Sequence, residues 1–140
     1  MAKEIFLSHA DEDAFEAELL QAQLENSLSD LGVRVWSYKR DQAGDERSIG
    51  SSIREGVHES AAVILLISQY TLESGATQWM ELAYADAFDI PTFVLMHHIT
   101  FEDLKRSSGV PPLVIEGQST SAVNWRSIEA DLRSKLTADD

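Results

Sequence analysis

The sequence contains no cysteine and few basic residues, and both shortages limit the kind of protein that it encodes. Without cysteine there is no disulfide framework and no thiolate metal site. Eleven Lys and Arg residues stand against twenty-four Asp and Glu residues, which gives a net charge of −13. Because such a charge repels phosphate backbones and anionic lipids, we expect neither nucleic acid nor a membrane as a partner.

Several motifs of nucleotide and hydrolase chemistry are also missing. The chain has no P-loop or other glycine-rich phosphate loop and no Gly-x-Ser-x-Gly elbow. Its start, Met1 to Leu7, is too short and too soon polar for a signal peptide. With no internal repeat and no low-complexity linker, residues 1–140 predict one domain, and we expect it in the cytoplasm.

What the chain does contain is an alternation of apolar runs with segments of helical period. The apolar runs predict strands at residues 4–8, 33–36, 61–68, 92–97 and 113–115. Five strands alternating with about five helices predict an α/β fold, a flavodoxin-like doubly wound parallel sheet.

The helices between these strands are marked by apolar spacing and by end signals. We expect Asp11 or Asp13 to cap the first helix and Gly32 to end it. The apolar positions of the helices are Leu20, Leu24, Leu28 and Leu31 in the first, Ile49, Ile53 and Val57 in the second, and Trp125, Ile128, Leu132 and Leu136 in the last, with a short amphipathic turn at residues 101–105.

Glu81 is an acidic residue inside an otherwise apolar helix, shortly after the central strand. Flavodoxin-like sheets bind ligands in the crevice between the ends of their first and third strands. Those ends are Ser8-His9-Ala10-Asp11 and Ser68-Gln69-Tyr70. Glu81 is therefore a candidate for this crevice, although a solvated helix acid is the commonest fate of a glutamate. Adjacent strand residues face opposite ways, so we expect Ser8 and His9 to be walls of the crevice and not a nucleophilic pair.

Five segments, in order along the chain, resemble the successive boxes of a TIR domain. They are Ile5-Phe6-Leu7-Ser8-His9-Ala10-Asp11-Glu12-Asp13, Gly32-Val33-Arg34-Val35-Trp36, Ala43-Gly44-Asp45 leading into the second helix, Val63-Ile64-Leu65-Leu66-Ile67-Ser68-Gln69-Tyr70, and Glu81-Leu82-Ala83. Each segment alone is a weak signal, whereas five in register are specific. The resemblance implies a single TIR domain over residues 1–140.

Many TIR domains, by this resemblance, cleave NAD at the nicotinamide glycosidic bond, and others only assemble with partner TIR domains. The resemblance implies that Glu81 is the catalytic residue and that NAD is a substrate, with no further cofactor. Glycoside cleavage passes through an oxocarbenium-like state that a carboxylate stabilises. Nicotinamide leaves as a neutral base, so one carboxylate suffices where ordinary glycosidases use two.

The other binding residues follow from the same resemblance. Ser8, His9 and Ala10 line the strand end, Trp36 and Asp45 stand in matching boxes, and Lys39 and Arg40 attract the pyrophosphate, as basic groups do. The loop from Ser37 to Arg47 matches the loop through which TIR domains contact each other.

The aromatic wall of the site is less clearly marked. The family usually places a tryptophan four residues before the glutamate, a position that Thr77 holds here, while Trp79 stands two before it. Either the helix begins after Trp79, or Tyr84 on the Glu81 face supplies an aromatic ring.

Three alternatives remain to be weighed. A non-catalytic TIR interaction module keeps every strand and loop described above. A phosphoacceptor receiver domain shares the fold, but Ser68 stands where the acceptor aspartate belongs. A metal site at His97 and His98 has no third ligand at a suitable sequence spacing, so none is predicted.

Overall fold

The computed structural model is organised around one parallel sheet, and it describes residues 3–36, 57–107, 109–112, 114 and 119–137. The strands are β1 (Glu4–Ser8), β2 (Arg34–Trp36), β3 (Ala62–Ile67), β4 (Thr92–Met96) and β5 (Ser119–Ser121). They pair in the order β2-β1-β3-β4-β5, and every pair is parallel. This is the flavodoxin-like strand order, so the fold class expected from the sequence is confirmed.

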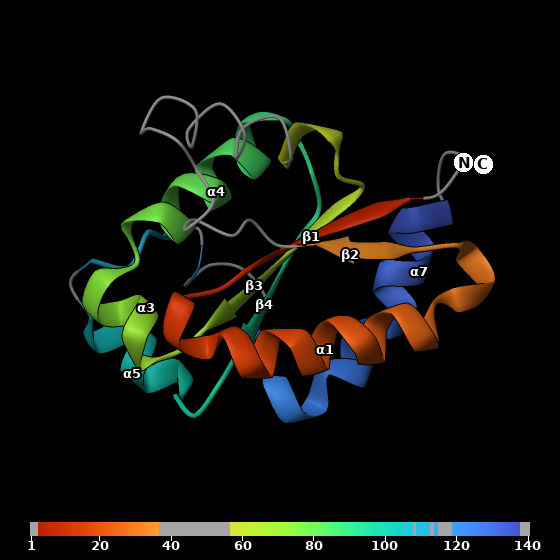
Figure 1. Ribbon diagram of the computed structural model, residues 1–140. Helices are drawn as coiled ribbons and strands as arrows, with labels where there is room; N and C mark the ends of the chain where they lie inside the picture. The colour runs from red at the N-terminus through yellow and green to blue at the C-terminus, as the bar shows by residue number, and fades with distance from the viewer. Residues whose placement is uncertain (1–2, 37–56, 108, 113, 115–118, 138–140) are drawn as a thin grey trace.

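Helices cover both faces of the sheet. Their bounds are η1 (Asp11–Asp13), α1 (Ala14–Ser27), η2 (Ser29–Leu31), α3 (Gln69–Ser74), α4 (Ala76–Ala87), α5 (Phe101–Arg106), η4 (Ala122–Ile128) and α7 (Glu129–Thr137), where η denotes a 3-10 helix. As Figure 1 shows, α1 and α7 lie on one face, and α3, α4 and α5 lie on the other. No helix in the described part of the chain has the length and the apolar character needed to cross a membrane.

Alternate side chains of the central strands feed two separate cores. Ile5 and Leu7 of β1 pack with the leucines of α1 and α7, whereas Phe6 packs with Leu82 and Ala85 of α4. All six side chains of β3 are buried in the same alternating way. A strand buried on both faces reads as a continuous apolar run, which is why the sequence marks β3 so clearly.

The first helix begins differently from the prediction. Asp11 and Asp13 belong to a 3-10 turn, and neither carboxylate caps α1. The Asp13 carboxylate instead accepts a hydrogen bond from the Ser68 hydroxyl, 55 residues away. Asp13 is therefore the N-cap residue of α1 by position, as predicted, but its side chain makes no capping bond because Ser68 is the partner of its carboxylate. Gly32 does end the segment, with a left-handed φ of 67°.

The prediction of the fifth strand is also wrong. The sequence predicts it at residues 113–115, but Val114 is helical and buried, and the strand that pairs with β4 is Ser119–Ser121. An edge strand is held by backbone pairing with one neighbour, so it needs no apolar run. The prediction followed the apolar residues, of which Val114 packs in a core, while Leu113 and Ile115 lie outside the described residues. Of the second predicted helix, Ile49 and Ile53 lie outside the described residues and Val57 is buried.

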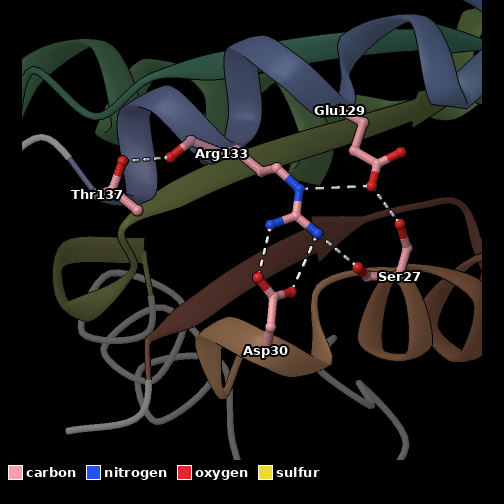
Figure 2. Close-up of polar contacts among 5 residues, drawn as sticks. All are labelled: Ser27, Asp30, Glu129, Arg133 and Thr137. Atoms are coloured by element: carbon pink, nitrogen blue, oxygen red, sulfur yellow. Dashed lines mark hydrogen bonds and ion pairs between the residues drawn. The ribbon is translucent and has the colours of Figure 1, made fainter.

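A polar network joins α7 to the end of α1 (Figure 2). Arg133 donates from Nη1 to Asp30 Oδ2 at 2.9 Å and from Nη2 to Asp30 Oδ1 at 3.0 Å. Its Nη2 also donates to the Ser27 carbonyl at 2.8 Å, and the Ser27 hydroxyl donates to Glu129 Oε1 at 2.5 Å. The bidentate geometry fixes both helices against each other on one face of the sheet.

These contacts lower the pKa values of the Asp30 and Glu129 carboxyls. The Arg133 guanidinium lowers the pKa of Asp30, and the Ser27 hydroxyl, more than Arg133, lowers the pKa of Glu129. A carboxyl with a lowered folded pKa contributes stability above its unfolded pKa, near 3.8 for Asp30 and 4.5 for Glu129. That contribution is lost as the pH falls through the lowered folded value.

Arg133→Met tests this network. We expect the variant to melt below the wild type at pH 7, and the difference in Tm to shrink as the pH falls below the ordinary carboxyl values of 4.5 and 3.8 and then through the lowered folded pKa values of Glu129 and Asp30. Calorimetry across this pH range measures it. Arg106→Met, which removes an exposed cation from α5, is the matched control. A Tm difference for Arg133→Met that does not change with pH would contradict the electrostatic account.

Candidate functional site

The carboxyl ends of β1 and β3 lie side by side in the middle of the sheet. From this edge the chain leaves β1 toward α1 on one face and leaves β3 toward α3 and α4 on the other (Figure 1). A crevice at such a reversal is where open α/β sheets bind ligands. The first candidate residues to inspect are therefore those at the ends of these two strands.

Ser8 and Glu81 meet at this edge. Ser8 is the last residue of β1, Glu81 lies in α4, and the Ser8 hydroxyl donates to Glu81 Oε1 at 2.6 Å. Both residues are almost fully buried, with 1% and 3% of their surfaces exposed. Burial excludes the interpretation of Glu81 as a solvated helix acid. The short hydrogen bond from Ser8 keeps the Glu81 carboxyl group in one orientation.

Glu81 is positioned by the turn of α4 that precedes it. Gln78, one turn earlier and 1% exposed, donates from Nε2 to the Leu66 carbonyl at 3.0 Å. Its Oε1 accepts from the Thr71 hydroxyl at 2.6 Å, and the Thr71 hydroxyl accepts from the Ser68 backbone N–H at 3.1 Å. These bonds attach α4 to the end of β3, while Leu82 packs into the core below. These contacts hold α4 with Glu81 facing Ser8.

Ser68 plays the matching part at the end of β3. It is the N-cap of α3, and its hydroxyl accepts from the Tyr70 backbone N–H at 3.2 Å. The same hydroxyl donates to the buried carboxylate of Asp13, just before α1. Ser68 thus joins the starts of helices on opposite faces of the sheet.

Some of the remaining predicted crevice residues lie near this edge, and others lie outside the described residues. Ala10 is buried, and His9 is partly buried with Nδ1 2.7 Å from the Ala10 carbonyl. Trp36 packs edge-on against Phe6 at 4.7 Å, and within the described residues its buried Nε1 has no hydrogen-bond partner. Lys39, Arg40 and Asp45, with the whole loop from Ser37 to Arg47, lie outside the described residues.

The aromatic residues of α4 answer one open question. α4 begins at Ala76, so Trp79 lies inside the helix, and the idea that the helix begins after Trp79 is wrong. Tyr84 stacks on Phe88 at 6.5 Å, one turn further along. Both Trp79 and Tyr84 are partly buried against the core on the α4 face.

Sequence reasoning missed three residues that hold the site: Gln78, Thr71 and Asp13. Gln78 had a readable signal, because it is a polar residue three positions before Glu81 on an apolar helix face. Thr71 had none, since its partner depends on how α3 meets α4. Asp13 stood in an acidic run that read as a helix cap. Asp13 also lies near Glu16 and His97. Each of these three residues offers one atom that could bind a metal, and the three atoms lie within 4.8 Å of one another.

Comparison with known proteins places this architecture in a family. A family model described as the TIR domain matches residues 5–134. A solved structure of a 2-desoxiribosyltransferase from Leishmania mexicana has a TM-score of 0.65 and 14% identity, over 91% of this chain and 95% of that one.

A second solved structure contains the TIR domains of the activated Roq1 resistosome, which is described as directly recognizing the pathogen effector XopQ. These domains have a TM-score of 0.56 and 19% identity to this chain, over 97% of this chain and 82% of that one. At these identities both likenesses show the fold. No curated protein matches the sequence significantly.

Gln78→Leu tests the attachment of α4. The substitution keeps the side-chain volume but leaves the Leu66 carbonyl and the Thr71 hydroxyl without their partner, so we expect a loss of about 1–3 kcal/mol in unfolding free energy. Urea denaturation measures it. Gln69→Leu is the control, because Gln69 bonds only the exposed Glu73 side chain in α3. Equal losses in both variants would mean that the buried bonds add nothing.

Proposed function

Because this chain belongs to the TIR domain family, we propose that it cleaves NAD at the bond between nicotinamide and ribose, with Glu81 as the catalytic residue. The observation that carries the proposal is the buried Glu81 carboxylate beside Ser8, at the strand ends where this fold binds ligands. The family contributes the substrate, and the geometry supports the residue.

The reaction asks little of the protein beyond one well-placed negative charge. As the bond between C1′ and the nicotinamide nitrogen breaks, its electron pair leaves with nicotinamide and cancels the ring's positive charge. The ribose develops oxocarbenium character, which the Glu81 carboxylate stabilises. Water then bonds to C1′ and loses a proton, giving ADP-ribose. An internal nucleophile in place of water gives a cyclic product.

Ser8 has a defined part in this scheme. Its hydroxyl occupies one side of Glu81 Oε1 at 2.6 Å and so sets the direction in which the carboxylate faces the ribose. Since Ser8 ends β1, this bond holds the carboxylate against a buried strand of the central sheet. Preorganised charge of this kind needs no reorientation during the reaction.

The fold comparison adds independent support. The Leishmania mexicana protein is named as a transferase of a 2-deoxyribosyl group, and it shares this architecture along almost its whole length. Sugar transfer of that kind also breaks a bond at the anomeric carbon, so the same fold serves related chemistry in that protein.

Access to Glu81 points to regulation by assembly. With only 3% of Glu81 exposed, the ribose reaches the carboxylate only if neighbouring segments move. The Roq1 structure describes TIR domains within a resistosome, an assembly. We therefore propose that self-association, through the loop from Ser37 to Arg47, opens and completes the site.

A non-catalytic TIR interaction module is the second candidate function. The observation that favours it is the place of Trp79, which lies inside α4 and only two residues before Glu81, so it does not share the Glu81 face of the helix. In that case the bond between Ser8 and Glu81 serves only the fold.

Nicotinamide release from NAD by concentrated, crowded protein tests the proposal. We expect Glu81→Gln, which keeps the side-chain shape but removes the charge, to lower the rate by at least about 100-fold. Ser8→Ala should lower it roughly tenfold, since one hydrogen bond to a charged group is lost. Glu73→Gln, on the exposed end of α3, is the matched control. Circular dichroism confirms folding of each variant. No release by the wild type would favour the interaction module.

The role of assembly has its own test. We expect the rate per molecule to rise with protein concentration, together with the mass measured by sedimentation, because binding between copies stabilises the open site. A rate per molecule that stays constant while the mass increases would show that assembly and catalysis are independent.

A further inference from the structure

A second cleft opens at the same edge of the sheet, beside the start of α1. It has a volume of about 380 Å³ and is lined by Glu12, Asp13, Glu16, Ser68, Gln69, Tyr70, His97 and His98. Figure 1 shows the start of α1 close to α3, with β4 ending at the same edge. This cleft shares Ser68, Gln69 and Tyr70 with the crevice at the strand ends, but Glu81 is not among its lining residues.

Three side chains converge in this cleft from three places in the chain. Asp13 closes η1, Glu16 lies in the first turn of α1, and His97 directly follows β4, held there by its N–H bond to the Ile67 carbonyl at 2.8 Å. One ligand atom from each of the three lies within 4.8 Å of the other two. Zinc ligands stand at about 2.0–2.1 Å, so two of them are at most about 4.2 Å apart. The Glu16 and His97 ligand atoms, 3.8 Å apart, already meet this limit, and Glu16 is 38% exposed.

The carboxylates that line the cleft favour a bound cation. Three carboxylates line it, and one of them, on Asp13, is 2% exposed and accepts its hydrogen bond from the neutral Ser68 hydroxyl. Among the described lining residues no lysine or arginine balances them. A buried ionised carboxylate is costly unless a cation pairs with it or a metal binds it, so a cation in this cleft would stabilise Asp13. His97 Nε2 is 3.8 Å from Glu16 Oε1, beyond hydrogen-bond length, which leaves room for an ion between them.

Another acidic cleft gives a useful contrast. At the amino end of β4, Asp86, Asp89 and Asp131 share a cleft with Lys135. That cleft carries its own cation and has no histidine among its described lining residues. The α1 cleft differs in both respects, so its composition is not simply a consequence of the acidic sequence.

We propose that Asp13, Glu16 and His97 bind a divalent transition-metal ion, with Zn²⁺ as the best match. Two carboxylate oxygens and one imidazole nitrogen suit zinc, whereas Mg²⁺ and Ca²⁺ prefer oxygen ligands alone. The surroundings support the ligands, because Ser68 donates to Asp13 and the His98 ring stacks on His97 at 4.0 Å. Such outer contacts hold metal ligands in orientation. The site departs from the sequence-based expectation, which found no third ligand near His97.

A bound ion would join the beginning of α1 to the end of β4 across the rim of the sheet. Glu81 is not one of the three proposed ligands. The proposal therefore does not depend on whether the chain cleaves NAD. A ligand that binds the folded state alone stabilises it by mass action. The measurable consequence is a rise in Tm that saturates at one ion per chain.

Titration of the full chain with Zn²⁺, followed by calorimetry and thermal melting at pH 7, tests the site. We expect one ion per wild-type chain, a higher Tm, and no comparable effect of Mg²⁺. Glu16→Gln and His97→Gln should weaken zinc binding by at least about tenfold, since each removes a ligand. Both side chains are partly exposed, so both variants should fold.

Two controls separate ligation from general attraction. Glu12→Gln removes a charge from the same cleft without removing one of the three ligands, and His58→Gln removes an exposed imidazole elsewhere. Both should bind zinc as the wild type does. Equal weakening by Glu12→Gln and Glu16→Gln, or the absence of wild-type binding at micromolar Zn²⁺, would overturn the proposal. A protonated His97 paired with Glu16 would then be the simpler account of the cleft.

Discussion

The burial of β3 on both of its faces is the constraint on which the rest of the structure depends. Its six side chains are all buried and alternate between two cores. Neither face can be left to water, so helices must cover both, and the chain must cross from one side of the sheet to the other. That crossing places the ends of β1 and β3 together at an open rim. Ser8 bonds to Glu81 and Ser68 bonds to Asp13 at this rim.

Two serines at the rim hold two buried acids in a parallel way. Ser8 ends β1 and donates to Glu81 on the α4 face, while Ser68 follows β3 and donates to Asp13 on the α1 face. In each pair a serine hydroxyl donates to a carboxylate oxygen and fixes its orientation. Held in this way, the two carboxylates suit the roles proposed for them, Glu81 toward a developing positive ribose and Asp13 toward a metal cation.

The polar contacts of α4 explain how a buried acid is tolerated there. Gln78 is bonded at both ends of its amide, so the turn before Glu81 has its polar groups satisfied. A fully connected polar network holds its members in one arrangement, whereas a partly connected one destabilises the core. Gln78 and Thr71 therefore hold the turn of α4 that positions Glu81.

The sequence by itself determined the fold class and the central strands. These follow from local patterns: continuous apolar runs, helical spacing and the strand order that such alternation favours. The polar edge strand Ser119–Ser121 escaped prediction because backbone pairing, which leaves no apolar signature, holds it. Only the tertiary structure decided that Asp13 bonds Ser68 and approaches His97. Those residues are far apart in the chain, and side-chain partners at such separations depend on how helices pack, which no local spacing encodes.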